Sequence, residues 1–462
     1  MEKEMSGIEN KMETMPIDRL MRNMGIPIIL SMMLYAFYNI VDSAFLSNMA
    51  EYGEEAINAL TLAYPIQIFI SAVCVGTSIG TNALASKALG QKDREKASRV
   101  AGNAIFLAIL IYIAWVLFAI FGVEWYIGTQ TTNPVVREMG VSYLRICCLF
   151  SFGTVFYSAY EKLLQAPGRA FYSSVAQAVG SVINIVLDPI LIFGAFGLPA
   201  MGVRGAACAT VIGQIAACVL AFSFHRRLDK EFEKGLRWLK PSGEIIREIY
   251  AVGLPVIITQ FLMSFLTFGM NLILVRVNES LVTVFGLYYK IQQFVMYAAF
   301  GLRDAITPIV SYSHGMKSNS RLRDGMRYGI IYTLIITGAG MIILEIFASP
   351  LAGIFGTSED TRQIFITATR IMAVGMFFSG ASIAIQGIFQ GVNRGLQTML
   401  IAICRQVIFV LPVAGAFVYA VRTAGAPLSL VWWTFPIAEI ITVIIGAFML
   451  RRFCKNYFLK DI

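Results

Sequence analysis

Residues 170–194 read AFYSSVAQAVGSVINIVLDPILIFG, a segment without Lys, Arg or His and with a single acidic residue. At 1.5 Å per residue, a helix of this length crosses the hydrocarbon core of a membrane. A barrel strand would alternate polar and apolar residues over about 10 positions, and this segment does not alternate. The segment therefore predicts a transmembrane helix that carries Asn184 and Asp188 inside the membrane.

The whole chain shares this apolar character. Of its 462 residues, 57% are hydrophobic and only 14% are charged, whereas soluble domains carry about 25% charged residues. So few charges cannot cover the surface of a soluble protein of this size. The composition excludes a soluble enzyme and a disordered chain, and it leaves the net charge of +9 to be explained by its location.

Eleven further segments meet the same criteria of length and apolarity, so the chain is predicted to be an all-α integral membrane protein with twelve transmembrane helices. The further segments are 24–46, 57–86, 99–122, 139–164, 205–224, 249–275, 281–301, 328–348, 364–390, 396–420 and 428–450.

The loops between these spans alternate in charge. Most of the 37 Lys and Arg lie in the termini and in every second loop, and the 226–247 segment is especially basic. The opposite loops carry only Arg137, Arg204, Arg276, Arg362 and Arg422. The positive-inside rule then places both termini in the cytoplasm. The net charge is a topology signal, and no nucleic-acid partner is expected.

The two halves of the chain repeat each other. GTSIGTNALASKALGQK from Gly76 aligns with GLRDAITPIVSYSHGMK from Gly301 at an offset of 225, and Gly25-Ile26-Pro27 aligns with Gly253-Leu254-Pro255 at an offset of 228. Six spans plus six spans in parallel predict two lobes related by a pseudo-two-fold axis along the membrane normal, with a cleft between them. The expected division is an N-terminal segment 1–23, an N-lobe 24–225, a cytoplasmic linker 226–247, a C-lobe 248–450 and a C-terminal segment 451–462.

Two acids inside the spans are the first candidates for function, because charges are rare and costly at membrane depth. Asp42 and Asp188 each lie about 18 residues, or roughly 27 Å, from the cytoplasmic start of their spans. Asn184 shares a helix face with Asp188, four residues on. Two carboxylates and an amide at one depth suit a pair that binds a proton or a small cation such as Na⁺. The alternative is that each acid only bonds a neighbouring helix.

The repeat confines this chemistry to the first lobe, because Met270, Phe409 and Val413 occupy the positions that correspond to Asp42, Asn184 and Asp188.

Other charges in the spans have simpler explanations. Glu161 precedes Lys162, which predicts a local salt bridge or a site near the cytoplasm, and Asp304 follows Arg303, which favours a structural pair. Glu439 has no partner near it in the sequence.

Two more cations, Lys290 and Arg405, are expected to be buried in the second lobe as partners for acids or carbonyls. Pro27 and Pro189 interrupt the hydrogen-bonding pattern of their spans and are candidate hinges.

Aromatic, methionine and glutamine side chains in the spans face lipid, pack, or line the cleft. If several line it, the surface would be polarizable and would suit lipophilic cations. The candidates are Tyr35, Tyr38, Phe156, Tyr157, Glu161, Gln260, Tyr289, Gln293, Met296 and Gln386.

Four motifs resemble the multidrug and toxic compound extrusion (MATE) transporters: PIILSMMLYAFYNIVDSAFLS from Pro27, NIVLDPILIFG from Asn184, GVRGAACATVIGQ from Gly202, and GIFQGVNRG followed by RQVIFVLP. The resemblance covers nearly the whole chain. It implies a twelve-helix, two-lobe antiporter that expels organic cations in exchange for H⁺ or Na⁺.

The resemblance also implies roles for individual residues. Asp42, Asn184 and Asp188 match the N-lobe cation site of the family, and a sixth-helix threonine of that site would be Thr210. Another branch uses a Glu and an Asp in the C-lobe, where this chain has Gln260 and Gln386 as its nearest polar residues. Glu161 occupies a fourth-helix position that is acidic in some drug-efflux members.

The expected protein is therefore a bacterial inner-membrane efflux antiporter, surrounded by lipid and monomeric, without a cofactor or a firmly bound metal and without enzymatic activity. One alternative is a lipid-linked sugar flippase of the same superfamily, which would want a large cationic cavity. The other is a membrane-embedded enzyme, which would need a catalytic or metal constellation at membrane depth. The two histidines lie at cytoplasmic span ends, and the seven cysteines form no CxxC pair, so ligands for such a centre are scarce.

Overall fold

The computed structural model describes residues 11–47, 49, 52–354 and 359–458, and within these ranges every regular element is a helix. The predicted terminal segments 1–23 and 451–462 lie partly outside the described residues. The N-terminal half contains α1 (Lys11–Thr14), α2 (Ile17–Ser47), α3 (Gly53–Gly90), α4 (Arg94–Phe121), α5 (Val123–Gln130), α6 (Pro134–Leu149), α7 (Phe152–Gln165), α8 (Ala170–Phe193) and α9 (Val203–Leu228).

The short 3₁₀ helix η1 (Leu236–Leu239) lies between the halves. The C-terminal half contains α10 (Gly243–Leu274), α11 (Glu279–Gly315), α12 (Asn319–Ile354), α13 (Glu359–Gly391), α14 (Gly395–Ile403), the π-helical turn η2 (Cys404–Ile408), α15 (Val410–Ala424), the 3₁₀ helix η3 (Leu428–Trp433) and α16 (Thr434–Phe458).

Each of the twelve predicted spans falls on one of these helices or on a broken helix. Among the described residues, ten helices are long and apolar enough to cross a membrane, or eleven if α6 and α7, which meet at 43°, form one bent span. The remaining span belongs to α11, which is 37 residues long but less apolar. This helix packs against α2, α3, α12 and α13, so protein rather than lipid surrounds much of it and polar residues are tolerated there.

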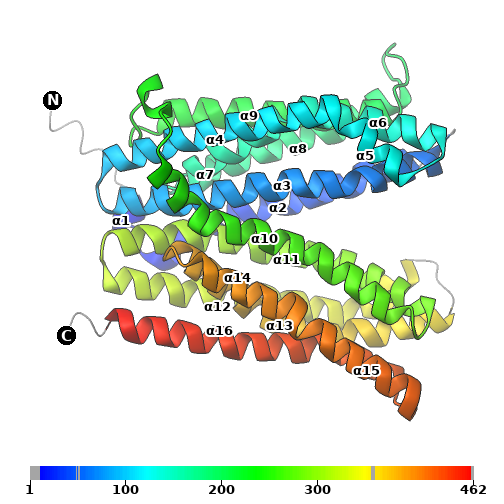
Figure 1. Ribbon diagram of the computed structural model, residues 1–462. Coiled ribbons are helices and arrows are strands. Elements are labelled where there is room, and N and C mark those ends of the chain that lie inside the picture. The colour runs from blue at the N-terminus through cyan, green and yellow to red at the C-terminus, as the bar shows by residue number, and fades with distance from the viewer. Residues whose placement is uncertain (1–10, 48, 50–51, 355–358, 459–462) are drawn as a thin grey trace.

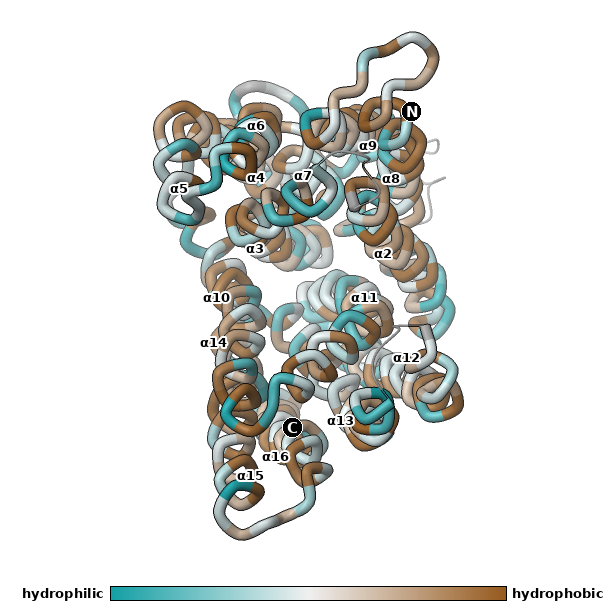
Figure 2. Tube along the Cα trace, turned by 90° about the vertical axis from the view of Figure 1, so that its right-hand side faces the viewer, coloured by the Kyte–Doolittle hydropathy of each residue, from teal (hydrophilic) through white to brown (hydrophobic). Residues whose placement is uncertain are grey.

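The helices form two lobes, α2–α9 and α10–α16 (Figure 1). The first described helix, α1, and the end of α16 lie at the same end of the bundle, which we call the terminal end. The lobes approach each other at this terminal end and their ribbons diverge toward the opposite end. Seen from that opposite end, the outer helices are mostly hydrophobic (Figure 2). An apolar periphery is expected where the solvent is lipid.

The first helix of each lobe also packs against the other lobe. The N-terminal half of α2 contributes Leu20, Met24 and Ile28 to a core shared with α11, α12 and α13. In the same way, Ile245 and Ile249 at the start of α10 join a core with α3, α4 and α7. The two exchanges are equivalent under the internal repeat, and they place apolar contacts between the lobes at the terminal end.

Glycines of the repeat allow helix backbones of the two lobes to touch. A Cβ atom on Gly80 in α3 would lie 2.1 Å from the Ile249 carbonyl oxygen in α10. One on Gly90 at the end of α3 would lie 2.2 Å from the Tyr312 carbonyl oxygen in α11. Only glycine fits such approaches. We call these α3–α10 and α3–α11 contacts the glycine seam.

The segment between the lobes is fixed to the N-lobe. Arg169, which precedes α8, contacts Asp229 and Glu231 at 2.7 Å each. Asn103 of α4 accepts a hydrogen bond of 2.8 Å from the Ser242 backbone, just before α10 begins. These bonds tie the entry of α10 to the lobe that precedes it in the chain.

Candidate functional site

Asn184, Asp188 and Thr210 form a buried polar group between α8 and α9. In the amide orientation that gives both ends a partner, Asn184 donates from its nitrogen to Asp188 Oδ2 at 3.3 Å and accepts from the Thr210 hydroxyl at 3.3 Å. Asp188 is fully buried and the other two side chains are buried as well. The structure thus brings together three of the four residues predicted for the cation site.

Small residues bring α8 and α9 close enough for these bonds. A Cβ atom on Gly213 of α9 would lie 2.5 Å from the Gly180 carbonyl oxygen in α8 and 3.2 Å from Cβ of Asn184. Close helix packing at glycine is the usual way to form side-chain hydrogen bonds between membrane helices. The GxxxN spacing from Gly180 to Asn184 puts the contact and the amide on one face of α8.

Asp42 lies near this group, on α2, which packs against α8. Its carboxylate is buried and interacts electrostatically with that of Asp188. Within the described part of the chain, Asp42 Oδ1 has no hydrogen-bond partner. A buried carboxylate oxygen without a partner is costly, so this oxygen is ready to accept a proton or to ligate a cation.

Tyr143, a residue near Asp42, was missed from the sequence. Tyr143 of α6 is buried and lies near Asp42, and its hydroxyl accepts a 3.1 Å hydrogen bond from Gln67 of α3. Nothing in the sequence around Tyr143 distinguishes it from the other aromatic residues of the spans. Only the packing of α6 on α3 brings it to the acid.

The oxygen atoms of Asp42, Asn184, Asp188 and Thr210 are ligands that suit a small, hard cation. They belong to two carboxylates, an amide and a hydroxyl, which are the oxygen ligands that such cations prefer. The described residues contain no group of three or more His, Cys, Asp or Glu that could hold a metal ion. The two carboxylates can also share a proton.

The predicted cleft residues differ in their environment. Tyr38, Tyr157, Met296 and Gln386 are buried, and the Tyr157 hydroxyl donates to the Ser173 carbonyl at 3.2 Å. The other six predicted residues, Tyr35, Phe156, Glu161, Gln260, Tyr289 and Gln293, are half-buried.

Aromatic residues from both lobes come together near the predicted set. Tyr35 packs edge-on against Tyr38, with ring centroids 5.0 Å apart. Tyr64 of α3 lies near Tyr35 in its own lobe and near Tyr289 in the other. Tyr64, a residue that is 61% exposed, was missed from the sequence.

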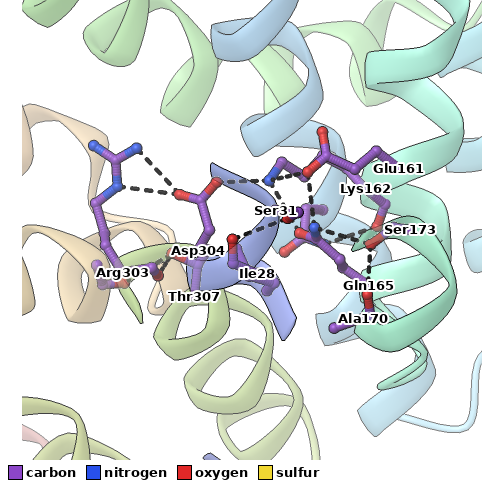
Figure 3. A network of polar contacts seen from close by, with 12 residues as sticks. Ile28, Ser31, Glu161, Lys162, Gln165, Ala170, Ser173, Arg303, Asp304 and Thr307 are labelled. Atoms are coloured by element: carbon purple, nitrogen blue, oxygen red, sulfur yellow. Dashed lines mark hydrogen bonds and ion pairs between the residues drawn. The ribbon is translucent and has the colours of Figure 1, made fainter. Parts of the chain in front are cut away.

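A second charged cluster joins the lobes (Figure 3). The expected neighbour pairs are present, Glu161 with Lys162 at 3.3 Å and Arg303 with Asp304 at 3.1 Å. In addition, Lys162 contacts Asp304 at 2.7 Å, although the two residues lie on different lobes. The sequence did not predict this contact, because it depends on how α7 and α11 meet.

The charges of the C-lobe follow one expectation and contradict another. Glu439 of α16 has a partner in Arg405 of η2, with Nε 2.5 Å from Oε1. Lys290, which was expected to be a buried cation, has an exposed side chain. The expectation rested on the apolar residues around it in the sequence, but position 290 lies on an uncovered face of α11.

The proline residues lie inside unbroken helices, Pro27 in α2 and Pro189 in α8. The irregular places in the spans are elsewhere, at the 43° bend between α6 and α7 and at the π-helical turn η2. A hinge at either proline stays a prediction.

Comparison with known proteins agrees with this architecture. The MatE family model matches residues 27–190 and 255–415. The two matches begin at Pro27 and Pro255, the prolines that the internal repeat aligns.

Relatives with known names and structures cover almost the whole chain. The multidrug export protein MepA of Staphylococcus aureus (strain bovine RF122 / ET3-1) is 23% identical over 427 residues, 92% of each chain. MepA of Staphylococcus saprophyticus is 23% identical over 390 residues, 84% of this chain and 85% of the relative. A crystal structure of MATE in complex with MaL6 has a TM-score of 0.89 at 23% identity, covering 97% of this chain and 98% of the other. An outward-facing multidrug resistance MATE family transporter of the MOP superfamily has a TM-score of 0.88 at 24% identity and covers 96% of both chains.

Proposed function

Since the chain belongs to the MATE family of multi-pass membrane transporters, we propose that it is a multidrug efflux antiporter that exports lipophilic and organic cations from a bacterial cell in exchange for H⁺ or Na⁺. Multidrug export is the activity in the names of its relatives. These names favour drug efflux over transport of a lipid-linked sugar.

The observation that carries the antiport proposal is the pair of buried acids in the N-lobe. Asp42 and Asp188 lie within electrostatic reach of each other, and Asp42 Oδ1 has no hydrogen-bond partner in the described ranges. Two such carboxylates cannot both stay ionised and unpaired at low cost. A proton or a sodium ion relieves the repulsion, so the site has a reason to bind the coupling ion.

Asn184 and Thr210 have positioning roles in this proposal. The Asn184 amide donates to Asp188, and the Thr210 hydroxyl donates to the amide oxygen. This chain of bonds fixes one carboxylate while the second, Asp42, keeps an oxygen available. We infer that Asp42 and Asp188 together take up the ion and that the amide sets their separation.

Coupling follows if the two ligands prefer different arrangements of the lobes. A bound ion changes the charge between α2 and α8 and so changes how these helices pack. A ligand can shift a two-state equilibrium only by its differential affinity for the two states. Efflux then requires the substrate to favour one arrangement and the ion to favour the other.

The substrate class follows from the aromatic residues that the two lobes bring together. Tyr64 of the N-lobe lies near Tyr35 of the same lobe and near Tyr289 of the C-lobe. Aromatic faces attract organic cations, and a surface of this kind tolerates substrates of different shape. We place substrate binding between the lobes at this aromatic group, with Glu161 as a nearby acid.

The orientation in the membrane follows from charge. The terminal end of the bundle carries the basic segments around the two termini and residues 226–247, so we place it in the cytoplasm. A single chain provides both lobes, so no second copy is needed to form the substrate site.

Transport by purified protein in proteoliposomes tests this proposal. A cationic dye such as ethidium would be followed while ΔpH or a Na⁺ gradient is imposed separately. The proposal expects dye movement against its own gradient with one of the two ions. Dye movement that is unchanged when both gradients are absent would contradict antiport.

A further inference from the structure

The contact between Lys162 and Asp304 is a buried ion pair that joins the two lobes. Lys162 Nζ of α7 lies 2.7 Å from Asp304 Oδ2 of α11, and the two side chains are only 5% and 3% exposed. Removing two charges from water is costly, and the cost is offset only while each charge has a partner. A bond of this kind strongly favours the arrangement of the lobes in which it forms.

Each of the two ions has a second partner within its own lobe. Lys162 donates to Glu161 at 3.3 Å and to Gln165 at 3.0 Å. Asp304 accepts from Arg303 Nη2 at 3.1 Å and from Nε at 3.2 Å. Separation of the lobes would therefore break one bond without leaving either charge unpaired (Figure 3).

The Lys162–Asp304 bond lies next to the closest contacts between the lobes, those of the glycine seam. Asn82 of α3 donates to the Lys162 carbonyl at 2.8 Å, and Asn82 lies between Gly80 and Gly90 of the glycine seam. Ser311 of α11 donates to the Ala83 carbonyl at 2.5 Å. The charged pair and the glycine seam thus form one continuous interface at the terminal end.

The internal repeat shows that the charge is an addition to this interface. Thr307 of α11 donates to the Gly387 carbonyl at 3.4 Å, the equivalent of the bond from Asn82 to Lys162. Gly387 stands where the N-lobe has Lys162, and it packs against Arg303. The packing of the seam is nearly symmetric, whereas the ion pair is present on one side of the pseudo-two-fold axis.

We propose that the Lys162–Asp304 bond holds the terminal end closed and breaks in each transport cycle, with Glu161 and Arg303 as the partners that retain the two charges in the open state. The proposal rests on alternating access of the two lobes, but it does not depend on which ion drives transport. It assigns Lys162, Asp304 and Arg303 a positioning role in gating. Glu161 then competes for Lys162 rather than acting only as an acid for substrates.

A distance measurement across the terminal end tests the proposal. Spin labels would be placed by Arg227→Cys on α9 and Arg452→Cys on α16, both exposed, after replacement of the seven native cysteines by alanine. Double electron–electron resonance then reports the separation of the lobes. When Lys162 and Asp304 are both retained, we expect one dominant short distance between the two spin labels.

Lys162→Met and Asp304→Asn each remove the inter-lobe bond. We expect both to raise the ratio of long to short distances by about tenfold or more, because only the closed arrangement contains the inter-lobe bond that is lost. A thermal melting curve would first show that both variants are folded. Unchanged distance distributions in both folded variants would overturn the proposal.

The buried pair within one lobe provides a matched control. Glu439→Gln removes the carboxylate from a buried pair of similar exposure, at 12% and 10%, whose partners both lie in the C-lobe. We expect this variant to lower the melting temperature and to leave the distances unchanged. If it shifts the distances as Lys162→Met does, general loosening rather than gating explains both, and the proposal fails.

The exchanged pair tests the role of the retaining partners. In the double variant Lys162→Asp with Asp304→Lys, the bond between the lobes can form again, but each charge now has a like charge beside it in its own lobe. We expect the short distance to return while dye export stays at least about tenfold below that of the unsubstituted protein. Full export by the exchanged pair would contradict the role of Glu161 and Arg303.

These distances need no ion gradient, so their outcome is separate from that of the antiport experiment. Loss of ion coupling with normal gating would contradict only the proposed function, and the reverse result would contradict only the gate.

Discussion

The Asn184 amide of α8 and the Thr210 hydroxyl of α9 lie 3.3 Å apart, so a residue from the neighbouring helix fixes the amide that contacts Asp188. Asn184 and Asp188 are neighbours on one face of α8, but the position of the Asp188 carboxylate also depends on Thr210 of α9. Loss of the bond should change the affinity for the coupling ion more than it changes the fold.

Thr210→Val tests this positioning role, because valine keeps the shape of threonine and lacks its hydroxyl. A net hydrogen bond is worth about 0.5–1.5 kcal/mol, so the ion concentration for half-maximal transport should rise roughly two- to tenfold. Thr210→Ser, which keeps the hydroxyl, should restore most of the affinity. Equal transport curves for the valine and serine variants would argue against a role for the hydroxyl.

Gly80→Ala tests the glycine seam. The added methyl group would lie 2.1 Å from the Ile249 carbonyl oxygen, so α3 and α10 must move apart. We expect a melting temperature several degrees lower, since overpacking costs about 1–3 kcal/mol. Gly415→Ala in α15 is the control, because nothing lies within 4 Å of its Cβ position. That variant should be neutral or slightly stabilising, as alanine favours helix over glycine by about 1 kcal/mol.

Arg405→Met tests the buried pair of the C-lobe. It leaves the Glu439 carboxylate without its partner at 2.5 Å, and breaking a buried pair by removal of one ion costs about 3–5 kcal/mol. The variant should therefore melt well below the unsubstituted protein in detergent. The double variant Arg405→Met with Glu439→Leu should recover stability, because no charge is then left unpaired. A single variant as stable as the unsubstituted protein would show that the pair contributes little.

The sequence predicted those features that depend on local pattern. Apolar length identified the spans, and the matched glycines from Gly76 and Gly301 identified the repeat. The spacing of Asn184 and Asp188 put both on one helix face, as the structure has them. The positions of Gly90 and Gly315 did not reveal that these glycines touch the opposite lobe, because a repeat shows equivalence and not contact.

Contacts between helices far apart in the chain could not be predicted. Lys162 and Glu161 are neighbours and predicted a local pair, whereas the bond to Asp304 requires α7 and α11 to meet. Tyr143 reaches Asp42 only through the packing of α6. The prediction that Lys290 is buried was wrong for the same reason, since burial of a helix face depends on its neighbours.

Ion counterflow in proteoliposomes with Asp188→Asn tests the central claim most directly, because asparagine keeps the shape of the side chain and removes its charge. Glu138→Gln near the start of α6, where the glutamate side chain is 75% exposed, is the matched control for loss of a carboxylate. We predict that Asp188→Asn abolishes the movement of H⁺ or Na⁺ that accompanies dye export and reduces export at least about tenfold, while Glu138→Gln changes neither. Export and ion counterflow that are both unchanged in Asp188→Asn would contradict the account.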